Sequence, residues 1–262
     1  MRYGLVANPD KKRCLEFAQK IVDKLSPIVE ESTARSLGLE GMPMEKMNVD
    51  VIITVGGDGT ILLALQRARG MILGVNMGLL GFLTEIKPEE FDEAIEKIER
   101  GEYFVDKRMR LKVSLNGKRL YDCTNEAVIH TSEIAKLRSY SIWYDEELLD
   151  EFRADGLIIA TPTGSTSYAL SAGGPIVHPY LEGMVITPIA PFKRYPRSFV
   201  LPMGKLRVEM KDGKKNLLVL DGQYSVEISE GDVVEIEKSE NYAMFIRFRN
   251  SPFKMIRERF LA

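Results

Sequence analysis

The sequence predicts an α/β N-terminal domain with a parallel sheet, followed by an all-β, sandwich-like domain. In the first hundred residues, short apolar runs alternate with segments of helical spacing, which is typical of a parallel sheet covered by helices. From about residue 103, short alternating segments follow one another, and the Asn116-Gly117 pair between two of them is a strong hairpin signal. The expected domains are 1–102 (α/β, nucleotide-binding), 103–248 (all-β) and a segment over 249–262 that packs back on the first domain or against strands alone.

The N-terminal elements follow from local composition and spacing. The β-branched run at 51–55 has the length of a strand that is buried on both faces. Pro88 suits the first turn of a helix, and Gly70 and Gly101 suit helix ends. Residues 26–49 indicate a short strand and loops without firm boundaries. The predicted elements are strands at 2–7, 51–55 and 71–75, and helices at 12–25, 61–69 and 88–100.

The second domain is expected to consist of short strands. Apolar and polar residues alternate along these segments, and turn residues separate them. The predicted strands are 110–115, 119–123, 125–131, 139–144, 148–153, 157–161, 184–189, 198–201, 205–210, 216–220, 225–228, 233–238 and 243–248.

Composition excludes several classes of function. The net charge of −2 gives no reason to expect a nucleic-acid partner. The apolar runs are too short for a membrane helix and the N-terminus reads as a strand, so we expect a cytoplasmic protein without a membrane partner. Cys14, Cys123, His130 and His178 are the only cysteines and histidines, which leaves little material for a zinc site or a histidine-based hydrolase.

A glycine turn follows the strand at 51–55. The turn is Gly56-Gly57-Asp58-Gly59-Thr60, and a helical segment comes directly after it. Glycines allow positive φ and a close approach of the backbone, while a helix N-terminus carries partial positive charge. The turn therefore predicts a phosphate site.

Asp58 needs an explanation, because a carboxylate about 4 Å from a phosphate oxygen is repelled by about 4 kcal/mol per charge pair at an effective dielectric near 20. It can help to hold a magnesium ion, or it can accept the proton of an attacking hydroxyl. The alternative is a turn residue that caps the helix. The two flanking glycines and the buried strand favour a role in phosphoryl transfer.

A second segment, 155–175, joins a buried strand to small and hydroxylated residues. Its hydroxyl groups are compact donors for ligand oxygens, and Tyr168 can lie flat against a heterocycle. Pro162 and Pro175 distinguish the segment from a flexible Gly/Ser tether. The sequence Gly-X-Ser-X-Gly does not occur, so a serine nucleophile is not indicated. This segment predicts a loop that wraps a polar ligand.

Together, four blocks make the whole chain resemble the NAD kinase family. In order, they are Gly56-Gly57-Asp58-Gly59-Thr60, Asn125-Glu126, the segment 155–174 and Asp221-Gly222-Gln223. Diacylglycerol and sphingosine kinases, and more loosely phosphofructokinases, share the first block, but these lipid kinases are not similar to the second and third.

The resemblance implies an enzyme that transfers the γ-phosphoryl group of ATP to the 2′-hydroxyl of the adenosine ribose of NAD, giving NADP, with Mg²⁺. Asp58 would be the general base and Asp155 would face the nicotinamide end. Bacterial members of the family frequently carry arginine at the position of Lys136, and variation at this site leaves the choice between NAD and NADH open. The residues implied in substrate or nucleotide binding are Gly57, Gly59, Asn125, Glu126, Lys136, Arg153, Asp155, Thr163, Thr166, Ser167, Tyr168, Ser171, Ala190 and Gln223.

Two other functions stay open at this point. One is a lipid or sugar kinase built on the same glycine turn, although the hydroxyl-rich loops suit a dinucleotide better. The other is a non-catalytic NAD-binding regulator, against which the intact Asp58 argues. The resemblance also implies a homodimer or homotetramer, in which another subunit covers the edges of the short strands.

Overall fold

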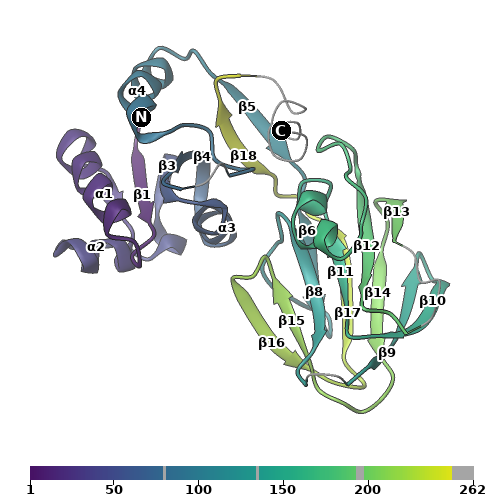
Figure 1. Ribbon diagram of the computed structural model, residues 1–262. Coiled ribbons are helices and arrows are strands. Elements are labelled where there is room, and N and C mark those ends of the chain that lie inside the picture. Colours follow the sequence, from purple (N-terminus) through teal and green to yellow (C-terminus); the bar gives the residue numbers. More distant parts are fainter. Residues whose placement is uncertain (79–80, 134–135, 193–197, 250–262) are drawn as a thin grey trace. The chain divides into compact units, whose positions relative to one another are not determined.

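Figure 1 shows the computed structural model of the chain. The structure describes residues 1–78, 81–133, 136–192 and 198–249. The chain divides into two compact units, which are Met1–Lys107 with Ala243–Ala262 (the N-terminal unit) and Arg108–Tyr242 (the β unit). The N-terminal unit contains a largely parallel sheet with helices, and the β unit contains antiparallel sheets. The predicted fold class is therefore confirmed.

The sheet of the N-terminal unit has six strands in the order β2-β1-β3-β4-β18-β5. The pairs β1–β2, β1–β3, β3–β4 and β4–β18 are parallel. Its strands are β1 (Tyr3–Ala7), β2 (Ile28–Val29), β3 (Asn48–Gly56), β4 (Arg69–Asn76), β5 (Phe104–Arg108) and β18 (Ala243–Arg247). Its helices are α1 (Lys12–Leu25), α2 (Glu31–Leu37), α3 (Asp58–Arg67) and α4 (Phe91–Glu99), with short 3-10 turns η1 (Met44–Lys46) and η2 (Pro88–Glu90).

Strand β3 is buried on both faces, as its composition predicts. Val51, Ile53 and Val55 pack into one apolar cluster with residues of α1 and α4. Ile52 packs into another cluster with residues of α3, including Ile61. Because helices cover both faces of β3, the end of this strand is held in place, and the position of the glycine turn is fixed with it.

Helix α3 differs from the sequence-based expectation at both ends. It begins at Asp58 instead of 61, and it ends at Arg67 with Ala68 in an extended conformation. Gly70, which was expected to end this helix, lies in β4 with φ of +148°. A Cβ at Gly70 would come within 3.1 Å of the Val49 carbonyl oxygen, so glycine serves strand packing here.

Strand β18 corrects the expected domain boundary. The sequence assigned 243–248 to the all-β domain, but β18 lies beside β4 in the N-terminal sheet, with Phe245 opposite Ile72. Ala243, Phe245 and Ile246 are buried there. Local alternation predicts a strand at this position but carries no information about its partner. Of the expected C-terminal segment over 249–262, residues 250–262 lie outside the described residues.

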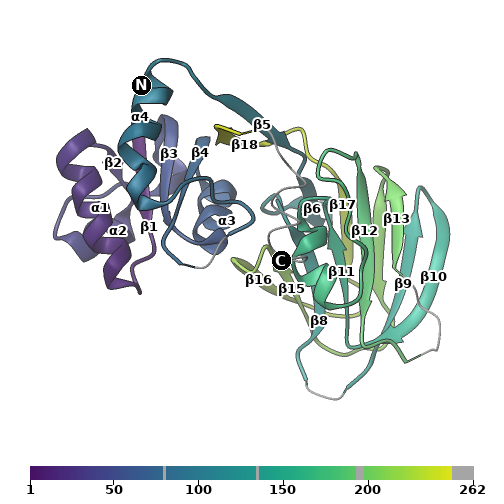
Figure 2. The same cartoon turned by 45° about the horizontal axis from the view of Figure 1, so that its top comes forward.

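The β unit contains two antiparallel sheets, with strand orders β10-β9-β14-β17-β6-β7 and β13-β12-β11-β8-β15-β16 (Figure 2). Side chains from both sheets form one apolar core, as in a sandwich. Its strands are β6 (Leu111–Leu115), β7 (Lys118–Arg119), β8 (Glu126–Thr131), β9 (Arg138–Tyr144), β10 (Glu147–Ala154), β11 (Gly156–Ala160), β12 (Gly183–Ile189), β13 (Phe199–Pro202), β14 (Leu206–Met210), β15 (Asn216–Leu220), β16 (Tyr224–Ile228) and β17 (Val233–Lys238).

A smaller apolar cluster packs the segment after β11 against the second sheet. It joins Val128, Ile158 and Val185 of the sheet to Ala169 and Val177. The segment forms a 3-10 turn η3 (Gly164–Thr166) and a short helix α5 (Tyr168–Ser171), so the small-residue loop is partly helical. Among the described residues of the chain, no helix has both the length and the apolar character needed to cross a membrane.

Candidate active site

Asp58 is the first residue of α3, directly after the turn that ends β3. Its Oδ2 accepts the N–H of Phe82 at 2.8 Å, and its Oδ1 accepts the N–H of Leu83 at 3.0 Å. The N-cap of α3 is Gly57, which makes no side-chain cap bond. Asp58 is half-buried. Its carboxylate thus holds a loop 24 and 25 residues further along the chain, and the helix-cap interpretation does not describe its bonding.

Space requires glycine at Gly56, whereas the backbone at Gly57 is open. None of Gly56, Gly57 and Gly59, all within the described part of the chain, has a positive φ. A Cβ at Gly56 would lie 2.4 Å from the Thr60 Oγ1. A Cβ at Gly57 would meet nothing within 4 Å, so the backbone there is open to a close neighbour. Of the two features that glycine allows, close approach of atoms accounts for Gly56, and positive φ accounts for none of the three.

The turn lies at the carboxyl edge of the parallel sheet, where α/β folds bind ligands. Strands β1, β3 and β4 run in the same direction and end at Ala7, Gly56 and Asn76. Helix α3 begins at the same edge, and its first N–H groups point out of the helix with the positive end of its dipole. This edge therefore suits a phosphate group.

The described residues supply few ligands for a metal ion. No group of three or more His, Cys, Asp or Glu side chains lies close enough together among them to hold one. Near the turn, Asp58 offers one carboxylate whose oxygens already accept two N–H bonds. Mg²⁺ in nucleotide sites is typically held by one or two carboxylates together with phosphates and water. The donor set fits a Mg²⁺ ion that arrives with a nucleotide, and it does not fit an all-protein cage.

In the β unit, Asp221 organises the backbone before β8. Its Oδ2 accepts the N–H of Thr124 at 2.6 Å, and its Oδ1 accepts those of Asn125 and Glu126 at 2.8 and 2.9 Å. Asp221 is 4 % exposed and has φ of +51°, which is unusual for a residue other than glycine. Sequence reasoning noted the Asp221-Gly222 turn but missed this role, because the bonds join residues 95 to 97 positions apart.

Glu126 is a buried carboxyl group at the start of β8. Its Oε1 accepts a hydrogen bond from Ser167 Oγ at 3.2 Å, and its Oε2 is buried without a hydrogen-bond partner among the described residues. Burial and the charge of Asp221 raise the pKa of Glu126 to about 8. Burial also raises the pKa of Asp221 to about 6, against the lowering effect of its three backbone N–H bonds. Glu126 is therefore largely protonated at neutral pH, with one buried oxygen that no described residue hydrogen-bonds.

The loop after β11 packs tightly against Asn125. The N–H of Thr161 donates to the Asn125 carbonyl oxygen at 2.8 Å. A Cβ at Gly164 would lie 2.1 Å from that same oxygen, so only glycine fits. Ser165 is fully buried and bonds to the Pro162 carbonyl oxygen and the Val177 N–H. Hydroxyl groups of this loop therefore also stabilise the loop through hydrogen bonds to its own backbone.

The predicted contacts in this loop differ in accessibility. Thr163 is buried and accepts a hydrogen bond from Arg108 at 3.4 Å, while Thr166 donates to the Thr163 carbonyl oxygen. Tyr168 and Ser171 are exposed. Gln223 is half-buried, and its side chain lies 3.5 Å from the Asp221 carbonyl oxygen. We call Asn125, Glu126, Thr163, Thr166, Ser167, Tyr168, Ser171, Asp221 and Gln223 the Glu126 cluster.

The remaining predicted residues lie at the other end of β11. The N–H of Asp155 donates to the Ile189 carbonyl oxygen at 3.0 Å, next to Ala190, which is exposed and has φ of +45°. The guanidinium carbon of Arg153 lies 5.7 Å from the centre of the Phe192 ring. Lys136 is exposed just before β9. We call Lys136, Arg153, Asp155 and Ala190 the Asp155 cluster.

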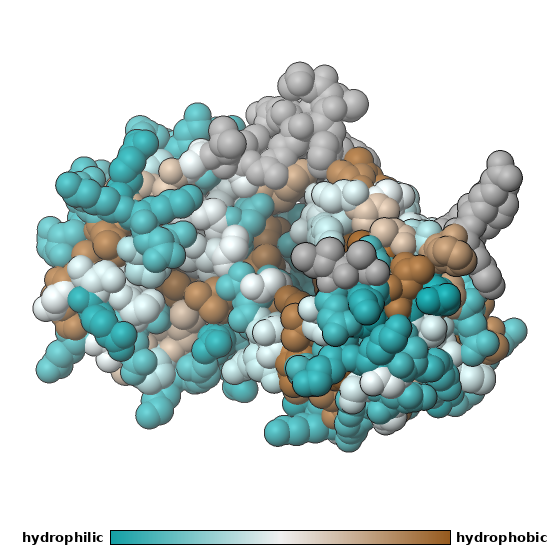
Figure 3. Space-filling model, turned by 60° about the horizontal axis from the view of Figure 1, so that its bottom comes forward, coloured by the Kyte–Doolittle hydropathy of each residue, from teal (hydrophilic) through white to brown (hydrophobic). Residues whose placement is uncertain are grey.

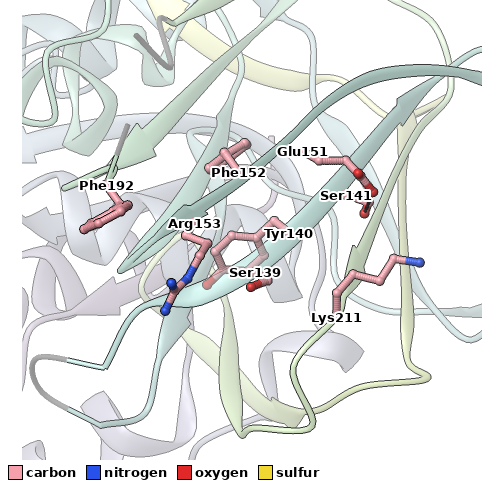
Figure 4. A pocket seen from close by; sticks show the side chains of 8 residues that line it. All are labelled: Ser139, Tyr140, Ser141, Glu151, Phe152, Arg153, Phe192 and Lys211. Carbon is pink, nitrogen blue, oxygen red and sulfur yellow. Dashed lines mark hydrogen bonds between the residues drawn. The ribbon is translucent and has the colours of Figure 1, made fainter. Parts of the chain in front are cut away.

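Arg153 also lines a pocket of about 260 Å³ (Figure 4). In that view the Arg153 and Phe192 side chains lie on one side of Tyr140, and Glu151, Ser141 and Lys211 lie on the other. The lining residues are Ser139, Tyr140, Ser141, Glu151, Phe152, Arg153, Phe192 and Lys211. The pocket offers both an aromatic surface and charged groups to a ligand.

The structure thus separates the β-unit residues into two clusters. Ala160 pairs with Glu126 at one end of β11, and Gly156 pairs with His130 at the other. Gly156 and Ala160 are separated by four residue steps of roughly 3.3 Å, or about 13 Å along the strand. Motif spacing does not give this separation, because residues of both clusters, such as Asp155 and Ser171, come from the same segment, 155–175.

Comparisons with known proteins agree with the resemblance seen in the sequence. The family model described as "ATP-NAD kinase N-terminal domain" matches residues 3–103, and "ATP-NAD kinase C-terminal domain" matches 124–248. The chain is 43 % identical to the NAD kinase of Thermoplasma volcanium, over 99 % of this chain and 97 % of the relative. It is 41 % identical to that of Methanothermobacter thermautotrophicus, over 100 % of this chain and 96 % of the relative.

Solved structures extend this comparison. An NAD kinase from Archaeoglobus fulgidus in complex with ATP is 35 % identical, with a TM-score of 0.80, covering 99 % of this chain and 97 % of that chain. Yeast NADH kinase complexed with NADH is 23 % identical with a TM-score of 0.91, covering 100 % of this chain and 87 % of that chain, which shows the shared fold. The chain therefore belongs to the NAD kinase family of phosphotransferase enzymes.

Proposed function

We propose that the protein transfers the γ-phosphoryl group of ATP to the 2′-hydroxyl of the adenosine ribose of NAD, with Asp58 as the general base. The observation that carries this proposal is the bonding of Asp58. Both carboxylate oxygens accept backbone N–H groups, yet the residue stays half-buried. A carboxylate held in this way is oriented and still open to a substrate hydroxyl.

The N-terminal unit supports phosphoryl transfer through its turn. Phosphoryl transfer requires mainly alignment of the reactants and stabilisation of charge. The open backbone at Gly57 and the N-terminus of α3 attract the phosphates of ATP. When bound with the nucleotide, Mg²⁺ would neutralise further charge, and Asp58, within the turn, would supply a carboxylate beside it. Asp58 then takes the proton of the ribose hydroxyl as its oxygen attacks phosphorus.

The β unit supports binding of the dinucleotide. Asp221 holds the backbone of Asn125 and Glu126. Oε2 of a protonated Glu126, which has no partner among the described residues, would suit a hydrogen bond to a ligand oxygen or nitrogen if the ligand reached it. The exposed Tyr168 offers a ring face for adenine, and Ser167 and Ser171 offer hydroxyl groups beside it. These features favour a dinucleotide over the lipid or sugar acceptors that the glycine turn alone leaves open.

The separation of the two β-unit clusters supports an oligomer, a homodimer or a homotetramer, in which subunits share sites. Strands β10 and β13 stand at the ends of their sheets, where uncovered backbone groups favour pairing or covering. Large apolar side chains are exposed nearby, including Leu148, Phe192 and Val200. Figure 3 shows one face of the molecule, with hydrophobic residues at the surface among hydrophilic ones. Light scattering at the assay concentration tests this, and a fully active monomer would rule it out.

One assay tests the proposed reaction. Purified protein is incubated with MgATP and NAD, and the product is detected with a dehydrogenase that accepts only NADP. We expect NADP that depends on both substrates and on the divalent metal. An absence of NADP with every nucleoside triphosphate tried would overturn the proposal. Phosphorylation of a lipid or sugar instead would support the alternative acceptor.

A further inference from the structure

Arg247, at the end of β18, is a buried cation whose hydrogen bonds reach the loop that holds Asp58. Only 4 % of Arg247 is exposed. Its Nη1 donates to the carbonyl oxygens of Leu83 and Thr84 at 3.0 and 3.2 Å and to Glu85 Oε2 at 3.0 Å. Its Nε donates to Asp106 Oδ2 at 3.4 Å. A single guanidinium group therefore connects β5, β18 and the loop.

Leu83 links this cation to the carboxylate of Asp58. Its carbonyl oxygen accepts from Arg247, and its N–H donates to Asp58 Oδ1 at 3.0 Å. The neighbouring N–H of Phe82 donates to Asp58 Oδ2. The contact between the loop and Asp58 is close, because a Cβ at Gly81 would lie 2.4 Å from Asp58 Oδ1. A shift of the loop must therefore move or release the carboxylate.

We propose that Arg247 is a positioning residue, which orients the Asp58 carboxylate through the backbone of Leu83. This inference rests on the proposed role of Asp58 as the base. Arg247 donates from two nitrogens, Nη1 to the loop and Nε to Asp106, and the single ammonium group of a lysine cannot reproduce both sets of contacts. The inference also explains why the chain returns from the β unit to add β18 to the N-terminal sheet. Strand β18 places Arg247 beside the loop.

Two variants separate positioning from general stability. Arg247→Lys keeps the charge but loses the hold on Leu83 and Thr84, whereas Asp106→Asn weakens a buried ion pair of Arg247 and leaves both carbonyl contacts in place. We expect both variants to lower the Tm. Only Arg247→Lys should lower kcat, by about 10- to 100-fold, with KM for NAD and ATP nearly unchanged, because small misplacements of a reacting group have effects of this size.

Hydrogen exchange of the Phe82 and Leu83 amides gives a readout that needs no turnover. Arg247→Lys should speed their exchange, and Asp106→Asn should not. The double variant Arg247→Met/Asp106→Asn removes both members of that buried pair, and it should show the same loss of kcat and of protection if Arg247→Lys does not fold. Unchanged protection and kcat in a folded Arg247 variant would overturn the inference. Wild-type protein that makes no NADP would overturn the proposed function instead.

Discussion

Asp58 and Asp221 make similar bonds in different surroundings. Each carboxylate accepts consecutive backbone N–H groups from a distant segment, two for Asp58 and three for Asp221. Asp58 is half-buried at the N-terminus of a helix, whereas Asp221 is almost completely buried in the β unit. Bonding alone therefore does not define the role of a carboxylate. Access decides whether it can exchange a proton with substrate or only organise the chain.

The largest expected effect is the loss of Asp221. Asp221→Ala leaves three backbone N–H groups without their acceptor at a buried position. Since each unsatisfied group costs about 1–3 kcal/mol, we expect the free energy of unfolding to fall by at least about 3 kcal/mol. Urea denaturation measures this change. An Asp221→Ala protein as stable as the wild type would contradict this assignment, because Asp221 would then not be the structural member of the pair.

Asp155 gives an intermediate case. Its backbone N–H is bonded within the sheet, and the residue is half-buried at the start of β11. We expect Asp155→Ala to weaken binding of NAD by about 1.5–3 kcal/mol, the value of a hydrogen bond to a charged group, and to leave binding of ATP unchanged. Isothermal calorimetry with each ligand separately tests this. Equal losses for both ligands would make Asp155 a structural turn residue, like Asp221.

A further expected effect is a dependence of stability on pH through Glu126. Burial and the charge of Asp221 raise the pKa of Glu126 to about 8 in the folded protein. The folded state therefore holds the proton more tightly than the unfolded chain, so stability falls as pH rises from the ordinary glutamate range to about 8. The slope reaches at most about 1.4 kcal/mol per pH unit.

Glu126→Gln should remove this dependence and raise the Tm at pH 8 relative to the wild type, with little change at pH 5. The exposed Glu147 provides the matched control, since Glu147→Gln should leave the pH profile of the Tm as it is. Thermal unfolding monitored by circular dichroism gives both profiles. A Tm that rises with pH between 5 and 8 in the wild type but not in Glu126→Gln would contradict this prediction. It would mean that the folded protein stabilises the Glu126 carboxyl group as an anion.

Local sequence predicted much of this molecule, and long-range pairing explains most of the rest. The run at 51–55 identified β3, because five β-branched and apolar residues suit a strand buried on both faces. The four motif blocks identified the family, as the comparisons confirm. Neither the partner of β18 nor the donors to Asp58 and Asp221 could be predicted, because these contacts join distant segments. A glycine in sequence does not reveal whether conformation or space requires it, as Gly56 shows.

The most direct test of the account compares kcat of Asp58→Asn with that of Arg247→Lys. The amide of Asn keeps an acceptor for one of the two loop N–H groups but cannot take the ribose proton. Arg247→Lys loosens the same loop and retains the base. If Asp58 is the base, Asp58→Asn should lose at least about 10²-fold in kcat and more than Arg247→Lys, with unchanged NAD affinity and no rescue by excess Mg²⁺. Retained turnover, or rescue by magnesium, would contradict the account.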